Sequence, residues 1–222
     1  MSDLAIPVGQ RIRQARLIAG LTLSEAAKRL SSRQRQSVSQ QKLSDYEKGN
    51  CVPSASLLLS LAQELRVGVS YFFHQPGVAV DLMGYRCQSR LTKTQKSRIE
   101  ALAQDEAERQ IYLYGALYPD GPPINFPDRE KVSSYAEAEE TAENLRRCWR
   151  LGCDPIESMT HTVENNGGIV VRCSGRIPRF EGLSGYANQS FPVVVVSGGV
   201  TDDRSRFSIA HEIGHLTMDT SA

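Results

Sequence analysis

The chain has 222 residues, of which 40% are hydrophobic and 23% charged, and its formal net charge is +1. This balance is typical of a globular protein with room for one large domain or two small ones. No apolar run approaches the roughly 18 residues of a membrane span, and the first ten residues lack the basic and apolar segments of a signal peptide. Composition therefore argues against a membrane-spanning or secreted protein, and we expect a cytoplasmic one.

Charge is distributed unevenly along the chain. Residues 1–76 contain ten Lys and Arg but five Asp and Glu, a net charge of +5, whereas the remainder has a net charge of −4. This asymmetry indicates two parts with different roles, the basic one suited to nucleic acid.

The cysteines are odd in number, and none has the C-x-x-C spacing of a zinc or redox motif. We therefore expect reduced thiols rather than a disulfide framework. The five are Cys51, Cys87, Cys148, Cys153 and Cys173.

Residues 8–73 have the pattern of five short helices. An apolar stripe marks a first helix that ends at Gly20, and Thr22 with Glu25 predicts a capping box at the start of the second. The polar stretch 31–37 then separates the second helix from the third. We expect the third helix to begin after Ser39 and to end near Gly49, a fourth to begin at Pro53 and Ser54, and a short fifth to include Val69, Phe72 and Phe73.

Residues 77–130 are expected to form a helical connector. Its helix runs from Thr92 to about Leu117 and ends before the Pro/Gly-rich stretch 119–127, which is the best boundary candidate in the chain. This helix is either a dimerisation element or packed core, and the pattern does not separate the two.

Residues 131–222 combine helical and β-strand patterns, which indicates an α+β domain. The sequence is expected to form a small sheet flanked by helices. Two helices come first, at 134–151 and from Pro155. The β-branched runs 169–171 and 193–196 follow, with 182–187 as an edge strand or turn between them, and a final helix begins near Asp203.

The third helix has the chemistry of a DNA-reading element. Ser39 is placed to cap it, so that its first N–H groups can face a phosphate. Gln40 and Gln41 would then project toward base edges, because glutamine offers the donor and acceptor that adenine requires, and Lys42 can donate to guanine.

These residues resemble the XRE family of helix-turn-helix regulators, over RIRQARLIAGLTLSEAAKRL and SVSQQKLSDYEKGNCVPS. The resemblance implies base-facing positions for Gln40, Gln41 and Asp45, and contacts to the DNA backbone for Thr22 and Lys48. It also implies a partly buried ion pair between Arg16 and Glu47 that ties the first and third helices together.

The chain departs from that family at two places. Leu23 replaces a polar residue that usually contacts phosphate, and the insertion SSRQRQ lengthens the turn between the second and third helices. Its basic residues, Arg33 and Arg35, can contact phosphate, or the insertion can change the angle between the helices. The alternative is that this part of the chain binds only protein.

Near the end of the chain stands the sequence His-Glu-Ile-Gly-His. His211 and His215 are four residues apart, so on a helix both imidazoles can bind one zinc ion, with Glu212 placed to act as a general base. The alternative is a chance match in which the two histidines only form hydrogen bonds.

Together with the flanking G-I-V-V, G-L-S-G-Y and D-R-S-R-F-S segments, this motif resembles the ImmA/IrrE family of zinc metallopeptidases. The resemblance implies a zincin-like fold and catalysis by Glu212. It also implies a repressor-type protein substrate, acted on in a stress or mobile-element response. The family's third ligand lies on a following helix that this sequence lacks, so we expect a piece of a longer protein or a member without activity. Asp219 is expected to be a plain surface carboxylate, and His161 a weak alternative donor.

The sequence thus predicts a multidomain protein in which an all-α helix-turn-helix domain (1–76) and a connector precede an α+β zincin-like domain. Its predicted function is that of a transcriptional regulator that binds an operator in double-stranded DNA and carries a zinc-dependent endopeptidase domain. A non-catalytic repressor or antitoxin whose second domain only binds a partner is the alternative. A homodimer is left open.

Overall fold

The computed structural model describes residues 5–33, 38–83, 91–175 and 177–220. The chain forms two compact units. The helical unit comprises residues 1–77 and 92–101, and the mixed unit comprises residues 78–91 and 102–222. The predicted order, a helical domain followed by a region of helices and strands, is therefore present.

Four α-helices and one 3-10 helix form residues 5–73 of the helical unit, as predicted. They are α1 (Ala5–Ile18), α2 (Leu23–Arg33), α3 (Gln40–Glu47), α4 (Ala55–Leu65) and η1 (Val69–Phe73). The expected caps are confirmed: Thr22 and Glu25 form the reciprocal capping box, and the hydroxyls of Ser39 and Ser54 accept from backbone N–H groups of α3 and α4. The first turns of α5 (Lys93–Leu117) also belong to this unit.

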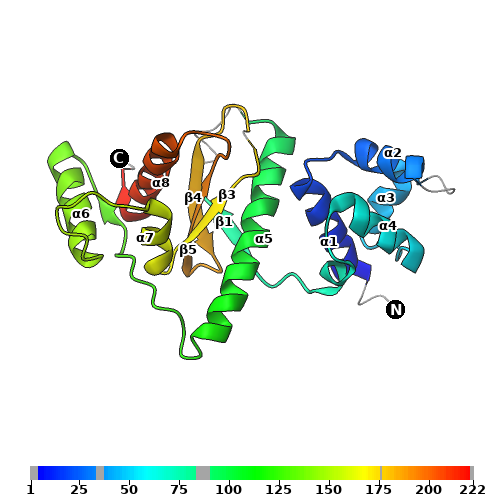
Figure 1. Ribbon diagram of the computed structural model, residues 1–222, viewed down its shortest axis with the longest axis horizontal. Helices are drawn as coiled ribbons and strands as arrows, with labels where there is room; N and C mark the ends of the chain where they lie inside the picture. The colour runs from blue at the N-terminus through cyan, green and yellow to red at the C-terminus, as the bar shows by residue number, and fades with distance from the viewer. Residues whose placement is uncertain (1–4, 34–37, 84–90, 176, 221–222) are drawn as a thin grey trace. The chain divides into compact units, whose positions relative to one another are not determined.

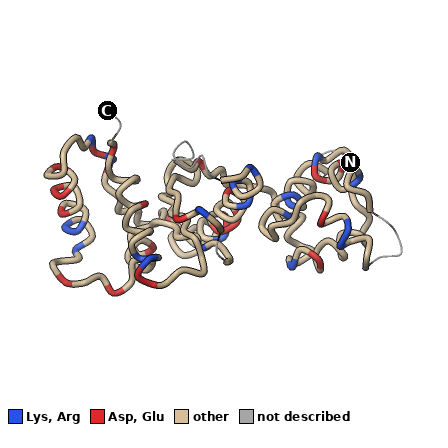
Figure 2. Tube along the Cα trace, turned by 90° about the horizontal axis from the view of Figure 1, so that it is seen from above, with Lys and Arg blue, Asp and Glu red and all other residues tan. Residues whose placement is uncertain are grey.

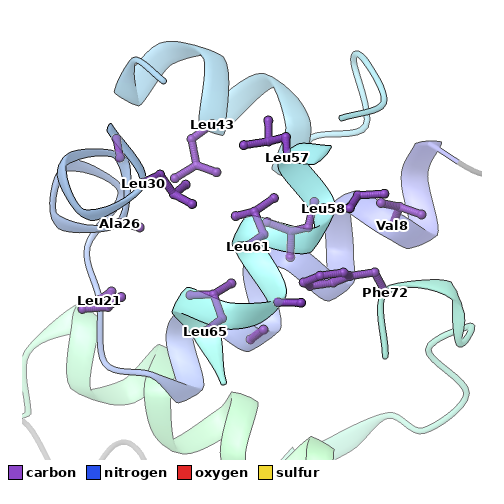
Figure 3. Packing of buried hydrophobic residues seen from close by; sticks show 14 residues of the cluster. Val8, Leu21, Ala26, Leu30, Leu43, Leu57, Leu58, Leu61, Leu65 and Phe72 are labelled. Carbon is purple, nitrogen blue, oxygen red and sulfur yellow. The ribbon is translucent and has the colours of Figure 1, made fainter. Parts of the chain in front are cut away.

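Aliphatic side chains from all five of these helices meet in one core. Leu30, Leu43 and Leu61 are almost fully buried there, and Phe72 of η1 closes it against Val8 of α1 (Figure 3). Each fully buried side chain of this size contributes about 1.5–3 kcal/mol. The apolar stripes therefore explain why the helices assemble.

Helices α1 and α3 are held together by a close backbone approach and by an ion pair. A Cβ atom at Gly9 would lie 2.3 Å from the carbonyl oxygen of Tyr46, so only glycine fits there. Nε and Nη2 of Arg16 donate to the two carboxylate oxygens of Glu47 at 2.5 and 2.8 Å, and both residues are buried. The predicted pair is confirmed.

The insertion between α2 and α3 leaves this packing intact. Helix α2 extends to Arg33, further than predicted, and residues 34–37, which include Arg35, lie outside the described residues. Ser31, the first residue of the insertion, bonds to Val38 shortly after it: the Ser31 hydroxyl accepts from the Val38 N–H at 3.0 Å and donates to the Val38 carbonyl at 3.2 Å.

The mixed unit is built on a four-stranded sheet with the order β1-β4-β5-β3. Strands β1 (Val80–Leu82), β4 (Gly182–Ala187) and β5 (Phe191–Val196) are antiparallel neighbours, and β3 (Ile169–Arg172) pairs with β5 in parallel. A second, parallel pair joins β2 (Glu130–Lys131) to β6 (Met218–Asp219).

Helices cover both faces of this sheet (Figure 1). The later turns of α5 lie on one face, where the ring of Tyr114 stacks on Phe191. On the other face α7 (Met159–Asn165) and α8 (Asp202–Thr217) form a core with the valines of β3 and β5. Helix α6 (Tyr135–Cys148) carries acidic residues in its first turns and arginines in its last, as Figure 2 shows, an order that suits the helix dipole.

Two sequence expectations for the mixed unit need correction. The segment 182–187 is not an edge strand or turn but the internal strand β4, because its small residues let β1 approach: a Cβ at Gly185 would lie 2.0 Å from the carbonyl oxygen of Asp81. The segment 77–130, expected to be a helical connector, supplies strand β1 to the sheet in addition to helix α5.

Among the described helices, none is both long and apolar enough to cross a membrane. Four cysteines of the described residues form no disulfide bond, and Cys87 lies outside the described residues.

Candidate functional site

The first candidate site is the exposed N-terminal end of α3. Ser39 caps this helix, since its hydroxyl accepts from the Lys42 N–H at 3.1 Å, and Ser39 itself is exposed. Gln40, Gln41 and Lys42 follow and are all exposed. The predicted base-reading side chains therefore share the solvent-facing start of one helix, whose other side is anchored by buried Leu43.

A small polar network follows on the same helix. The Gln41 side-chain amide donates to Oδ1 of half-buried Asp45 at 3.3 Å, and Asn50 donates to the same oxygen at 3.4 Å. The ammonium of Lys42 lies 5.3 Å from the centre of the Tyr46 ring. The sequence did not indicate Asn50 as a candidate site residue. The signal that could have suggested it is its position shortly after the end of α3.

The two residues predicted to contact the DNA backbone are both exposed, at helix ends. Thr22 precedes α2, and its hydroxyl and N–H both donate to the Glu25 carboxylate. Both groups therefore take part in the N-terminal cap of α2. Those bonds lower the pKa of Glu25, the backbone bond most. Lys48 is the residue that ends α3, and its side chain points to solvent.

The second candidate site lies on α8 in the mixed unit. His211 and His215 are exposed one helical turn apart, and their Nε2 atoms are 3.2 Å from each other. Two imidazoles on one tetrahedral zinc ion, with Zn–N bonds of about 2.0–2.1 Å, place their nitrogens about 3.3 Å apart. The geometry of the pair thus fits two ligands of one ion. The ring of Phe207, 71% exposed, lies nearly parallel to that of His211.

Glu212, on the same helix, is turned toward the sheet. Its Oε2 accepts from the Ser184 hydroxyl at 3.0 Å, and both residues are buried. A Cβ at Gly182 would lie 2.8 Å from Glu212 Cγ, so β4 packs directly against the carboxyl group. Burial raises the pKa of Glu212, and the Ser184 bond and the nearby His211 oppose that rise.

Arg129 is a cation that acts on the histidine pair. It lies just before β2, donates to the Met218 carbonyl at 2.9 Å, and pairs with Asp219 at 3.8 Å. Burial lowers the pKa of His215, and His211 and Arg129 lower it further. Asp219 is therefore not a plain surface carboxylate: α8 ends at Thr217, and Asp219 is half-buried in β6 beside Arg129.

The described part of the chain does not supply a third metal ligand. Within that part no group of three His, Cys, Asp or Glu side chains is arranged to hold a metal ion. His161, the weak alternative donor, is exposed on α7 and its N–H bonds to the cap residue Ser158. The two histidines therefore supply two of the three protein ligands that a catalytic zinc site normally has.

Comparison with known proteins identifies one part of the chain. A family model described as a helix-turn-helix domain matches residues 7–70, which run from the first turn of α1 to the start of η1. No curated protein and no solved structure matches the chain. The helix-turn-helix part of the predicted resemblance is thus confirmed, and it supports a DNA-binding regulator.

Proposed function

We propose that the helical unit binds an operator by placing α3 in the major groove of double-stranded DNA. The exposed run from Ser39 to Lys42 at the capped start of α3, within the matched helix-turn-helix domain, is the observation that carries this proposal. Gln40 and Gln41 would meet base edges, and Lys42 would meet a guanine or a phosphate.

Two further features support this orientation. Asp45 accepts from both Gln41 and Asn50, which limits the conformations of the Gln41 amide before DNA arrives. Thr22 and Lys48 are exposed at the two helix ends where the family contacts the DNA backbone. Leu23 is half-buried against the core and so contributes packing where a phosphate contact is usual.

The test is a binding assay against an operator selected from random DNA, with Gln41→Ala compared to wild type. Loss of a base contact should reduce discrimination at one base pair by about 1–3 kcal/mol and leave binding to random DNA unchanged. Gln63→Ala, at an exposed glutamine of α4, is the matched control and should change neither. Equal weakening of specific and random DNA by Gln41→Ala would contradict base reading.

Salt supplies an independent test of the DNA proposal. Residues 1–76 carry a net charge of +5, so binding should release counterions and weaken steeply as salt rises. Lys48→Ala should lower the slope of log K against log salt by about 1 and weaken all sequences alike. If Lys48→Ala leaves this slope unchanged, Lys48 does not contact the DNA backbone.

For the mixed unit we propose a zinc-binding role for His211 and His215, supported by the 3.2 Å separation of their Nε2 atoms. A zinc ion held there would supply Lewis-acid activation of a peptide carbonyl. Glu212, whose pKa is raised by burial, is the group that can hold a proton beside the ion. We further propose that the mixed unit, once a third ligand completes the zinc site, is a zinc-dependent endopeptidase that acts on a repressor-type protein.

Zinc titration of these 222 residues tests the metal proposal without relying on activity. Two imidazoles leave the ion under-ligated, so we expect weak binding and no peptide hydrolysis. His211→Ala or His215→Ala should abolish binding, whereas His161→Ala, at the exposed histidine of α7, should not. Stoichiometric zinc that survives dialysis against a mild chelator would show that a third protein ligand exists. No binding at all would favour the alternative of a domain that only recognises a partner.

A further inference from the structure

Two basic residues of the helical unit each lie over the ring of a tyrosine, at the same distance. The Arg11 guanidinium is 5.3 Å from the centre of the Tyr71 ring, and the Lys42 ammonium is 5.3 Å from the centre of the Tyr46 ring. A cation at this distance is attracted by the negative face of the ring. The two contacts have the same chemistry, so their surroundings decide what each of them does.

The contact of Arg11 with Tyr71 belongs to the fold. Arg11 is buried, and its guanidinium donates to the backbone carbonyls of His74 and Gln75 at 2.8 and 2.9 Å. Its remaining nitrogen donates to Oε1 of Gln14 at 2.7 Å. The donors of Arg11 are therefore occupied inside the protein, where they fasten α1 to the residues after η1.

The contact of Lys42 with Tyr46 lies on the exposed start of α3. Lys42 is exposed, and Asp45, a carboxylate three residues further along α3, accepts from Gln41 and Asn50. An ion pair with a carboxylate would offset the charge of the lysine. A neutral ring holds the ammonium but leaves its full charge, and N–H donors of the ammonium can still reach a ligand.

Tyr46 is a fixed partner for this mobile side chain. It is half-buried, and it packs against the hydrophobic core of the helical unit. Lys42 and Tyr46 are four residues apart on α3, so they lie on the same side of the helix. A lysine has a long flexible stem whose ordering costs free energy on binding. Contact with the anchored ring keeps the ammonium against the surface of α3 before DNA arrives.

The position of this ammonium distinguishes the two groups that Lys42 could contact. A recognition helix lies in the major groove with its first residues against base edges, whereas the phosphates lie along the walls of the groove. We propose that Tyr46 is a positioning residue that holds Lys42 against α3, so that Lys42 donates to a guanine rather than to a phosphate. Guanine offers the N7 and O6 acceptors that suit a lysine. This inference rests on the proposed placement of α3 in the major groove and adds one base to what it reads.

The test compares the affinity of the 222-residue chain for its selected operator with that for operators changed at one base pair. Lys42→Ala should lower the preference for guanine at one base pair by about fivefold or more. Tyr46→Leu removes the ring but keeps an apolar side chain, so it should lower that same preference by about two- to fivefold. Tyr46→Phe keeps the ring and should retain the wild-type preference. Each preference is a ratio of two affinities of one protein sample, so a partly unfolded variant does not distort it.

Two further variants separate positioning from a general effect on the fold. Tyr71→Leu is the matched control, because Tyr71 is also half-buried, packs against the same core and lies beside a cation. It should leave the guanine preference unchanged whatever its effect on stability. The double variant Lys42→Ala with Tyr46→Leu should lose no more preference than Lys42→Ala alone, because Tyr46 acts through Lys42.

Three results would overturn the proposal. Uniform weakening of all DNA sequences by Lys42→Ala would show a phosphate contact. Equal guanine preference in Tyr46→Leu and Tyr46→Phe would show that the ring does not position Lys42. In both cases sequence-selective binding by the wild type would still support α3 as the reading helix. A wild-type chain that selects no operator at all would overturn the proposed function itself, and this role of Tyr46 with it.

Discussion

Each unit of this protein buries a glutamate, and the two are buried in opposite ways. Glu47 in the helical unit meets the Arg16 guanidinium in a two-pronged ion pair, and the third nitrogen of that guanidinium donates to the Leu21 carbonyl at 2.7 Å. Glu212 in the mixed unit accepts a hydrogen bond from the neutral hydroxyl of Ser184. Burial raises the pKa of Glu212, whereas Glu47 lies against a permanent positive charge.

This difference is the one expected between a carboxylate that holds the fold together and the carboxylate that we propose holds a proton. A buried carboxylate that is paired and fully hydrogen-bonded ties elements together, and its loss leaves its partner charge unpaired. A buried carboxylate without a cation weakens the fold when ionised and is retained where proton transfer is useful. The comparison therefore predicts opposite results for similar substitutions in the two units.

The largest expected effect is on the ion pair of the helical unit. Arg16→Ala should lower the free energy of unfolding of that unit by about 3–5 kcal/mol, because Glu47 is left charged and buried. Chemical denaturation followed by circular dichroism measures the change, with exposed Arg13→Ala as the matched control. Replacing both partners, Arg16→Leu with Glu47→Leu, should cost less than the single change. A loss below about 1 kcal/mol for Arg16→Ala would show that solvent screens the pair.

Glu212→Gln should act in the opposite direction. With a chelator present at neutral pH, the variant should be more stable than wild type, because the neutral amide removes a buried charge and can still accept from Ser184. The raised pKa means that the folded state holds this proton more tightly than the unfolded state. Wild-type stability from this group is therefore present at low pH and lost as pH rises through the raised pKa.

Thermal unfolding from mildly acidic to neutral pH measures this trend. The gap between wild type and Glu212→Gln should close as the pH falls. Glu47→Gln is the comparison variant and should be destabilising at neutral pH, since it breaks the ion pair with Arg16. If both glutamine variants shift stability in the same direction, the distinction between the two carboxylates is wrong.

The smallest expected effect concerns helix caps, which both units use in the same way. Ser39→Ala in the helical unit and Ser134→Ala in the mixed unit each remove a hydroxyl that accepts from a backbone N–H, and each should cost about 1 kcal/mol. The units should differ only in DNA affinity, which Ser39→Ala lowers and Ser134→Ala leaves unchanged. A fall in DNA affinity with Ser134→Ala would place a DNA contact in the mixed unit as well.

Local features of this protein could be predicted from the sequence because their partners are close along the chain. The capping box of Thr22 and Glu25, the caps at Ser39 and Ser54, and the four-residue spacing of His211 and His215 each depend on a single helical turn. The ion pair of Arg16 and Glu47 joins residues far apart in the sequence. Its prediction rests on the resemblance to a family of helix-turn-helix regulators. The pair is present although the chain carries the insertion between α2 and α3.

Features that depend on backbone segments far apart in the sequence are determined only by the tertiary structure. Strand β1 joins β4 across about one hundred residues, β2 pairs with β6 through two residues each, and Gly9 and Gly185 sit where another backbone passes too close for a side chain. No local pattern encodes such neighbours, because a two- or three-residue strand has almost no periodicity to detect. The same holds for Glu212: its motif is visible in the sequence, but its burial against β4 depends on a strand almost thirty residues earlier.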